Sequence, residues 1–246
     1  MNKETERIKI GIPGFDELVD KGVPKGFSIL FSGGCGTGKT IFCLHSMKYA
    51  CSKGEKCLYI SFEESPERLK QHMRNFGWKP DEYEEKGLMK IKRLDSFSVS
   101  RDVEALFHKA KGELLIEKEM LDLIPSGFKP DRIFIDSITA LAVAFAQREE
   151  AYRFYMEQLF RYLEKLETSC FLISETEEAP DKLSISGVEE FLADGVFVFY
   201  NVRKGSSRQR ALEVLKLRGT PHLNRIVPFD IMNKGISIKS EERIFE

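Results

Sequence analysis

Short apolar runs alternate with longer stretches of helical periodicity through the first two thirds of the chain. Apolar runs bounded by polar residues are typical of buried strands, and five of them stand out, at residues 27–31, 57–62, 88–94, 132–136 and 170–174. Between them, apolar positions three and four residues apart predict helices at about residues 40–51, 65–75, 102–119 and 149–167. Because strands and helices alternate, the pattern predicts a parallel sheet with helices packed on its faces.

The last fifty residues follow a different pattern. Three apolar-rich runs, at residues 196–201, 211–217 and 236–238, are joined by short turns rather than by helical stretches. That spacing is typical of antiparallel hairpins. The predicted fold class is therefore α/β, with a mostly parallel sheet flanked by helices and C-terminal antiparallel hairpins.

One predicted helix carries a clear start signal. Ser65 precedes Pro66 and Glu67, so that an N-capping hydroxyl group, a proline at the first helical position and an acidic first turn follow one another. Gly77 is placed to end the same helix just after Asn75.

The composition of the 246 residues is that of an ordinary globular chain, with 42% hydrophobic and 31% charged residues. Lys and Arg number 38 against 39 Asp and Glu, and this balance argues against a polyanion-binding protein driven by bulk charge. Five cysteines without a CxxC pair indicate a reducing compartment rather than a disulfide scaffold or a zinc site. No linker-like segment divides the chain, so we expect a single domain over residues 1–246.

No targeting or membrane segment is evident in the sequence. The stretch of the first nine residues is charged rather than apolar, and the best apolar segment, at residues 133–146, is interrupted by Asp136, Ser137 and Thr139. We therefore expect a cytoplasmic protein without a membrane partner.

A glycine-rich loop follows the first predicted strand. Residues 33–40 read GGCGTGKT and fit the phosphate-binding motif G-x-x-x-x-G-K-[ST] between a strand and a helix. The glycines let several backbone N–H groups point at one anion, and the helix N-terminus adds positive potential. Lys39 can reach the β- and γ-phosphates, which also makes it a catalytic candidate, and the Thr40 hydroxyl group can ligate Mg²⁺. The predicted residues for binding ATP or ADP are Gly34, Cys35, Gly36, Thr37, Gly38, Lys39, Thr40 and Ile41. The alternatives are a chance glycine-rich turn and a loop that binds phosphate without turnover.

A second metal position is predicted at Asp136. The residue ends the apolar strand at 132–136, about a hundred residues after the phosphate loop. A carboxylate in that place holds Mg²⁺ through water in phosphate-loop proteins.

Two adjacent carboxylates, Glu63 and Glu64, end the strand at residues 57–62. Hydrolysis needs a carboxylate at the carboxyl edge of the sheet to orient the attacking water. Successive strand residues point to opposite faces, so only one of the two can face the γ-phosphate unless the strand ends between them. We favour Glu63 as the base and Glu64 as its support. The alternative is that one or both only provide a favourable acidic start to the next helix.

Lys216 and Arg218 lie two residues apart in a predicted strand and emerge from the same face. Such a pair is commonly a solvated strand edge. In a nucleotide-binding domain it could instead complete a γ-phosphate site across a subunit boundary, as an arginine finger does.

Four blocks of sequence occur together along nearly the whole chain. They are GIPGFDEL at residues 11–18, the phosphate loop at 33–40, FEESP at 62–66 and LEVLKLRGTPH at 212–222, and GVEEF at 187–191 and PF at 228–229 accompany them. In this combination the chain resembles the KaiC-domain family of RecA/DnaB-like P-loop ATPases.

The resemblance implies a RecA-type core that assembles into a homo-oligomeric ring, most often a hexamer, with ATP between neighbours. It implies that Lys216, Arg218 and His222 reach the triphosphate of the neighbouring subunit. It also implies that the paired glutamates supply the hydrolytic base. Asn75 falls where the family contacts the nucleotide from the end of the next helix, with Asn in place of Ser.

Two features depart from the clock members of the family. KaiC carries two such domains, whereas this chain has one, and Glu189 and Glu190 stand in the region where its second domain carries adjacent phosphorylated Ser and Thr residues. Autokinase activity is therefore not expected. The predicted function is a Mg²⁺-dependent ATPase that acts as an oligomeric conformational switch or regulatory enzyme, with an unknown protein partner.

Two other functions stay open, a DNA-associated recombination or repair accessory protein and a nucleotide-sensing scaffold with little turnover. The basic hairpin tip formed by Arg203, Lys204, Arg208 and Arg210 could contact nucleic acid. A solvated hairpin is the simpler interpretation, and the acidic stretch at residues 175–181 disfavours DNA nearby.

Overall fold

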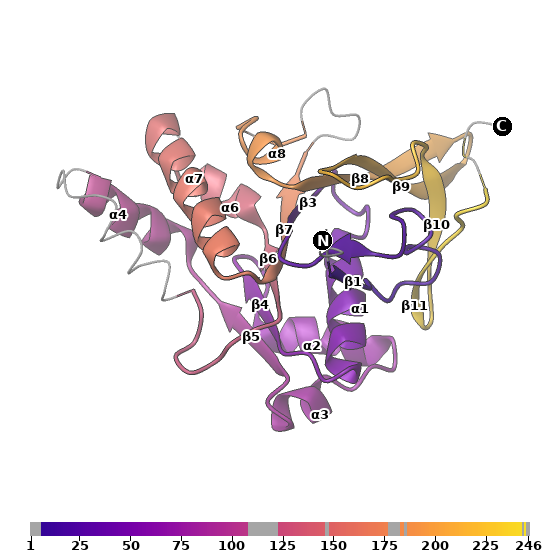
Figure 1. The fold of residues 1–246 in the computed structure, drawn as a ribbon, viewed down its shortest axis with the longest axis horizontal. Coiled ribbons are helices and arrows are strands. Elements are labelled where there is room, and N and C mark those ends of the chain that lie inside the picture. The colour runs from indigo at the N-terminus through magenta and orange to yellow at the C-terminus, as the bar shows by residue number, and fades with distance from the viewer. Residues whose placement is uncertain are drawn as a thin grey trace, which may run out of the picture.

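A nine-stranded sheet forms the centre of the part of the chain that the computed structural model describes, namely residues 6–107, 123–145, 148–176, 183–184, 186–242 and 244. The strands are β3 (Ser28–Gly33), β4 (Cys57–Ser61), β5 (Met89–Arg93), β6 (Arg132–Asp136), β7 (Ser169–Glu175), β8 (Gly195–Lys204), β9 (Ser207–Leu217), β10 (Val227–Met232) and β11 (Gly235–Ile238). Their order is β11-β10-β9-β8-β3-β7-β6-β4-β5 (Figure 1). The pairs from β8 to β5 are parallel, and β9, β10 and β11 are added antiparallel. A separate two-stranded ribbon pairs β1 (Arg7–Ile8) with β2 (Val23–Pro24).

Helices cover both faces of the parallel part of the sheet (Figure 1). One face carries α1 (Lys39–Ser52), α2 (Pro66–Asn75) and α3 (Pro80–Glu85), and the other carries α4 (Ser96–Phe107), α6 (Ile138–Ala144) and α7 (Glu149–Lys165). A one-turn helix, α8 (Glu189–Leu192), precedes β8. Within the described residues, no helix has the length and apolar character needed to cross a membrane.

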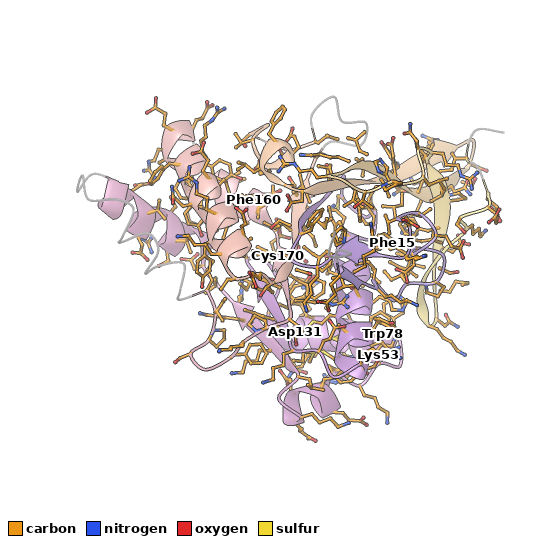
Figure 2. All side chains as sticks on the ribbon, in the orientation of Figure 1. Phe15, Lys53, Trp78, Asp131, Phe160 and Cys170 are labelled. Carbon is orange, nitrogen blue, oxygen red and sulfur yellow. The ribbon has the colours of Figure 1, made fainter. Side chains whose placement is uncertain are left out.

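The central strands are apolar throughout because each is buried on both faces. In β3, Phe31 packs into the core beneath α1, and its neighbour Leu30 packs into the core beneath α7. This alternation follows from the two-residue repeat of a strand. Phe15 and Phe160 mark the two cores, on opposite sides of the sheet (Figure 2). The same repeat decides which side chains of β4 and β6 face α1, and this placement matters for the site described below.

The predicted fold class, the five parallel strands and the C-terminal strands are confirmed. The start signal at Ser65 is confirmed as well, because its Oγ accepts a hydrogen bond of 3.3 Å from the Arg68 amide and the helix begins at Pro66. The helix expected at residues 102–119 is placed too late, since α4 begins at Ser96, and residues 108–122 lie outside the described part of the chain.

Several short elements are not predicted by the sequence pattern. The strand β10 contains Pro228, which normally argues against a strand inside a sheet. In the structure Pro228 is the second residue of β10 and is paired with Ala211 of β9, whereas the pairing with β11 begins at Phe229. The Pro228 carbonyl group accepts a hydrogen bond of 2.9 Å from the Lys239 amide. The helices α3 and α6 have six and seven residues, too few to show a helical repeat clearly.

Candidate active site

The glycine-rich loop leaves the sheet at Gly33, where β3 lies between β7 and β8, and enters α1 at Lys39. Gly36 and Gly38 have φ values of 73° and 98°, in the left-handed region that favours glycine. A Cβ atom on Gly38 would lie 2.9 Å from Cδ1 of Ile231 in β10. The glycine spacing of the motif therefore serves both the backbone turn and the close packing of the antiparallel strands.

The N-terminus of α1 is available to an anion. Gly38 occupies the N-cap position and, within the described residues, no side chain caps the helix. The first turn of a helix has backbone N–H groups without helical partners, and its dipole adds positive potential there. The loop is closed on itself by a hydrogen bond of 2.9 Å from Thr37 Oγ1 to the Gly34 carbonyl group. This geometry fits a phosphate group.

Lys39 lies buried beneath the loop. Its Nζ donates hydrogen bonds to the carbonyl groups of Gly33 at 2.7 Å and Gly34 at 2.9 Å. Burial lowers the pKa of the ammonium group, and the nearby carboxylates of Glu175 and Asp136 oppose that shift. The positive charge is therefore held beside the phosphate position by the loop that would bind the phosphate.

Thr40 and Asp136 meet as the sequence predicts. The Thr40 hydroxyl group donates a hydrogen bond of 2.9 Å to Oδ2 of Asp136, and the buried Tyr59 hydroxyl group donates one of 2.6 Å to the same oxygen. Burial raises the pKa of Asp136 to about 6, although both hydrogen bonds lower it, and the Glu63 carboxylate raises it further. Asp136 is thus a costly buried carboxylate that two hydroxyl groups stabilise.

The chemistry of these donors fits Mg²⁺. A hydroxyl group and a carboxylate are hard oxygen donors, and Mg²⁺ is commonly held by one or two such groups together with phosphate oxygens and water. Among the residues that the structure describes, no group of three or more His, Cys, Asp or Glu side chains could hold a metal ion by itself. A magnesium ion would therefore be held by Thr40 and Asp136 jointly with a nucleotide.

The two adjacent glutamates have different surroundings. Glu63 Oε1 accepts a hydrogen bond of 2.5 Å from the hydroxyl group of Ser137, next to Asp136. Glu64 Oε2 lies 2.8 Å from Arg68 Nε and 2.9 Å from His72 Nε2, so it faces α2. The Ser61 hydroxyl group accepts from both glutamate amides and shapes the turn between them. Of the two glutamates, only Glu63 is directed towards the side of the site formed by Thr40 and Asp136, which we call the metal side.

Lys216, Arg218 and His222, which are predicted to reach the neighbouring subunit, lie at the end of the sheet opposite to the phosphate loop. In the pairing of β9 with β8, Leu217 is opposite Gly195, and Gly195 in turn is opposite Ile29 near the start of β3. Lys216 Nζ donates to the carbonyl groups of Glu190 and Ala193 at 2.9 and 2.7 Å, and burial lowers its pKa.

Arg218 is anchored in the same place and remains half-exposed. It donates to the Phe191 carbonyl group at 2.8 Å and lies 3.4 Å from Oδ1 of Asp194. His222 follows, with Nδ1 at 3.2 Å from the Thr220 carbonyl group. The structure does not bring Lys216, Arg218 or His222 to the phosphate loop of their own subunit.

Three further predicted residues lie at the border of the site. Cys35 is exposed on the loop, and Ile41 is half-buried in the first turn of α1. Asn75 is exposed at the end of α2, where its Oδ1 accepts a hydrogen bond of 3.0 Å from Gln71 Nε2. A ten-residue helix is about 15 Å long, so Asn75 could meet only a part of the nucleotide remote from Glu63.

Residues that the motifs do not contain also contribute to the site. Tyr59 and Ser137 hold the two carboxylates, and Arg210 of β9 donates from Nε to the Gly36 carbonyl group at 3.1 Å. The strand repeat places Tyr59 on the same face of β4 as Ser61, but its contact with Asp136 depends on the pairing of β4 with β6. Arg210 carries no such signal, since its position depends on the register of β9 with β8.

Taken as a whole, the order of the parallel strands and the placement of the loop, the buried lysine and the Thr40–Asp136 pair define a P-loop nucleotide-binding protein. The family can be named from comparison with known proteins. The chain belongs to the KaiC family of ATPases, whose family model, described as "ATPase: KaiC", matches residues 8–243.

The similar proteins include both clock and non-clock relatives. Circadian clock protein KaiC3 of Synechocystis is 33% identical over 234 residues, which cover 95% of this chain and 45% of that protein. UPF0273 protein PH0284 of Pyrococcus horikoshii is 32% identical over 238 residues, which cover 95% of this chain and 94% of that protein. The chain thus spans about half the length of the circadian relatives and nearly all of PH0284.

A solved structure supports the same assignment. The KaiC-like protein PH0186 from Pyrococcus horikoshii OT3 superposes with a TM-score of 0.78 at 31% sequence identity, covering 96% of this chain and 99% of that one. The mostly parallel sheet with its C-terminal antiparallel strands is therefore a fold that the chain shares with a single-domain KaiC-like protein.

Proposed function

We propose that the protein binds ATP with Mg²⁺ and hydrolyses it. The observation that carries the proposal is the convergence of Lys39, the Thr40–Asp136 pair and Glu63 at one edge of the sheet. A P-loop that only bound phosphate would not need a carboxylate directed towards the metal side. Family membership supports nucleotide chemistry, and the geometry of these residues supports turnover.

Each residue has a part in the proposed reaction. The loop amides and Lys39 bind the β- and γ-phosphates, and Thr40 and Asp136 hold Mg²⁺, which neutralises charge on the phosphate oxygens when bound. Glu63 orients a water molecule for attack on the γ-phosphate and accepts its proton. The Ser137 hydroxyl group keeps the Glu63 carboxylate beside Asp136. Arg68 and His72 of α2 hold the Glu64 carboxylate and thereby stabilise the turn that contains Glu63.

We further propose that the active protein is a homo-oligomeric ring, a hexamer by analogy with the family, with ATP between subunits. Two observations support a trans role for the basic residues at the end of β9. They lie at the edge of the sheet opposite to their own loop, and α8 backbone carbonyl groups hold Lys216 and Arg218 in fixed positions. In this proposal, hydrolysis changes the conformation of the ring, and that change regulates its binding to a protein partner.

We do not favour a DNA-handling role, because the net charge of −1 provides no bulk attraction for a polyanion. The basic side chains of the β8–β9 hairpin include Arg203, which donates to the Gly205 carbonyl group, and Arg210, which donates to the phosphate loop. Most of the acidic stretch after β7 lies outside the described residues.

The proposal is tested by light scattering after size-exclusion chromatography, with ATP, with ADP and without nucleotide, while phosphate release is measured in the same samples. Wild type is compared with Arg218→Ala and, as a matched control, with Arg203→Ala at the hairpin tip. We expect an ATP-dependent oligomer with turnover that falls at least about a hundredfold in Arg218→Ala and is unchanged in Arg203→Ala. A monomer whose turnover ignores Arg218→Ala would reject the trans arrangement. A wild type that binds ATP without releasing phosphate would reject the ATPase and leave the nucleotide-sensing scaffold.

A further inference from the structure

Tyr59 is a fully buried side chain on the face of β4 that points towards α1. Its hydroxyl group lies 2.6 Å from Oδ2 of Asp136, closer than the Thr40 hydroxyl group, which reaches the same oxygen at 2.9 Å. Both donors therefore fix one oxygen of the carboxylate. Neither the phosphate-loop motif nor the carboxylate at the end of β6 accounts for a tyrosine at this position.

The direction of this hydrogen bond follows from the chemistry of the two groups. An ionised carboxylate carries no proton and only accepts, so the Tyr59 phenol donates to Oδ2 of Asp136. A charge-assisted hydrogen bond in a low-dielectric interior is stronger than one between neutral groups.

The ring of Tyr59 is held rigidly. Tyr59 is paired with Phe134 across β4 and β6, and the two rings stack with centroids 6.0 Å apart and an interplanar angle of 18°. Phe134 stacks in turn on Phe171 of β7, with centroids 5.1 Å apart. Because three neighbouring strands position these rings, the hydroxyl group is delivered to Asp136 with little freedom.

We propose that Tyr59 is a positioning residue for the metal side of the site, and that its hydroxyl group sets the affinity for Mg²⁺ by orienting the Asp136 carboxylate. The proposal rests on the proposed function, since it assumes that Asp136 assists Mg²⁺ binding with nucleotide. Removing a group that hydrogen-bonds to a metal-ligating side chain typically lowers metal affinity by about 10- to 100-fold.

The test uses Tyr59→Phe, which removes only the hydroxyl oxygen. Tyr200→Phe is the matched control, because the Tyr200 hydroxyl group also donates a hydrogen bond of 2.6 Å to a carboxylate, that of Glu213 on the β8–β9 hairpin. Binding of a fluorescent ADP analogue is measured as Mg²⁺ is titrated, and separately in EDTA. This readout does not depend on hydrolysis.

We expect Tyr59→Phe to need about tenfold more Mg²⁺ for half of the Mg²⁺-dependent increase in binding, with the affinity in EDTA unchanged. Tyr200→Phe should follow wild type in both measurements. An unchanged Mg²⁺ requirement in Tyr59→Phe would overturn the role of Tyr59 while leaving the ATPase proposal intact. A wild type without any Mg²⁺-dependent binding would instead overturn the metal site, and both proposals with it.

A second variant guards against a loss of folding. Tyr59→Met also lacks the hydroxyl group, and the flexible methionine side chain fills irregular spaces in a core. Thermal unfolding of each variant identifies those that fold, and the Mg²⁺ titration of either folded variant decides the proposal in the same way.

Discussion

The hydroxyl group of Thr40 donates a hydrogen bond of 2.9 Å to Asp136, a residue 96 positions later in the chain. The bond joins the first turn of α1, which follows β3, to the carboxyl end of β6, and β7 lies between β3 and β6 in the sheet. The polar residues of the metal side are therefore in contact within one subunit. The arrangement places the Asp136 carboxylate in the interior, and the cost of burying its charge can be measured as a change in the free energy of unfolding.

Asp136→Asn should stabilise the protein and abolish Mg²⁺-dependent turnover. Burial raises the pKa of Asp136 from 3.8 to about 6, so the folded state binds protons more strongly than the unfolded state between these values. The stabilising effect of the protonated form is lost as the pH rises through 6, and at neutral pH the ionised carboxylate costs about 3 kcal/mol at most. Asparagine keeps an oxygen that can accept from Tyr59 and Thr40 without the charge.

Thermal unfolding of Asp136→Asn and wild type at pH 7.5 and at pH 4.5 checks this prediction. We expect the variant to melt several degrees higher at pH 7.5, on the basis of about 2–4 °C per kcal/mol for a chain of this size, and the difference to shrink at pH 4.5. Equal melting temperatures of the variant and wild type at pH 7.5 would show that Asp136 is better solvated than its burial indicates.

Glu63→Gln and Glu64→Gln should differ sharply in turnover. Glu63 is directed to Ser137 and the metal side, whereas Glu64 is engaged by Arg68 and His72. Loss of a general base typically lowers the rate by about 10²- to 10⁴-fold, so we expect Glu63→Gln to fall in that range while it still binds ATP. Glu64→Gln removes a partly exposed ion pair and should lose less than about 1 kcal/mol of stability, with turnover within a few-fold of wild type.

Single-turnover phosphate release, measured together with ATP binding, separates the two variants. Equal losses of turnover in both would mean that the glutamates act as one unit, and a larger loss in Glu64→Gln would reverse their assignment.

The guanidinium group of Arg210 should support nucleotide affinity through the phosphate loop. Its Nε donates a hydrogen bond of 3.1 Å to the Gly36 carbonyl group, and Arg210 is paired with Asn201, whose side-chain nitrogen also lies near Gly36. The hydrogen bond steadies the loop and brings positive charge beside it. We expect Arg210→Ala to weaken ADP binding by about three- to tenfold, which corresponds to about 1 kcal/mol.

Calorimetric titration of ADP into Arg210→Ala and into Arg203→Ala provides the comparison. Arg203 is exposed on the same hairpin and donates to the Gly205 carbonyl group rather than to the loop. The same dissociation constant in both variants and in wild type would exclude a role for the Arg210 contact in binding.

The sequence predicts the main architecture and the residues of the site that local motifs contain. Strand length and apolar character identify the parallel strands, and the glycine spacing identifies the loop, because both are local consequences of burial and of backbone conformation. Tyr59 and Arg210 were missed because each acts across strands, and a contact of that kind depends on strand order and register. The strand β10 was missed because a proline normally argues against a strand inside a sheet, and its pairing with Ala211 of β9 is evident only once the strands are in register.

The contribution of His45 in α1 to the stability of the protein should fall as the pH drops below about 6.5, against the opposite contribution of Asp136. The imidazole ring is buried beside Trp78, where the two rings stack with centroids 5.0 Å apart and Nδ1 accepts a hydrogen bond of 3.2 Å from the Ile236 amide. Burial, and next the charge of Lys48, lower the pKa of His45 from 6.5 to about 4. The folded state therefore holds the neutral ring.

The sign of the effect follows from this depressed pKa. Between about pH 6.5 and 4 the unfolded state binds the proton and the folded state does not, so the contribution of His45 is complete above pH 6.5 and is lost as the pH falls towards 4. The total change is about 3 kcal/mol. His45→Asn can keep an acceptor for the Ile236 amide but loses the ring contact with Trp78, so its free energy of unfolding should be lower than that of wild type at pH 7.5. Because asparagine does not titrate, the free energy of unfolding of the variant should fall less steeply as the pH drops. Urea unfolding of both proteins at several values between pH 7.5 and 4.5 measures the two slopes, and parallel slopes would place the acid sensitivity of the fold on other groups.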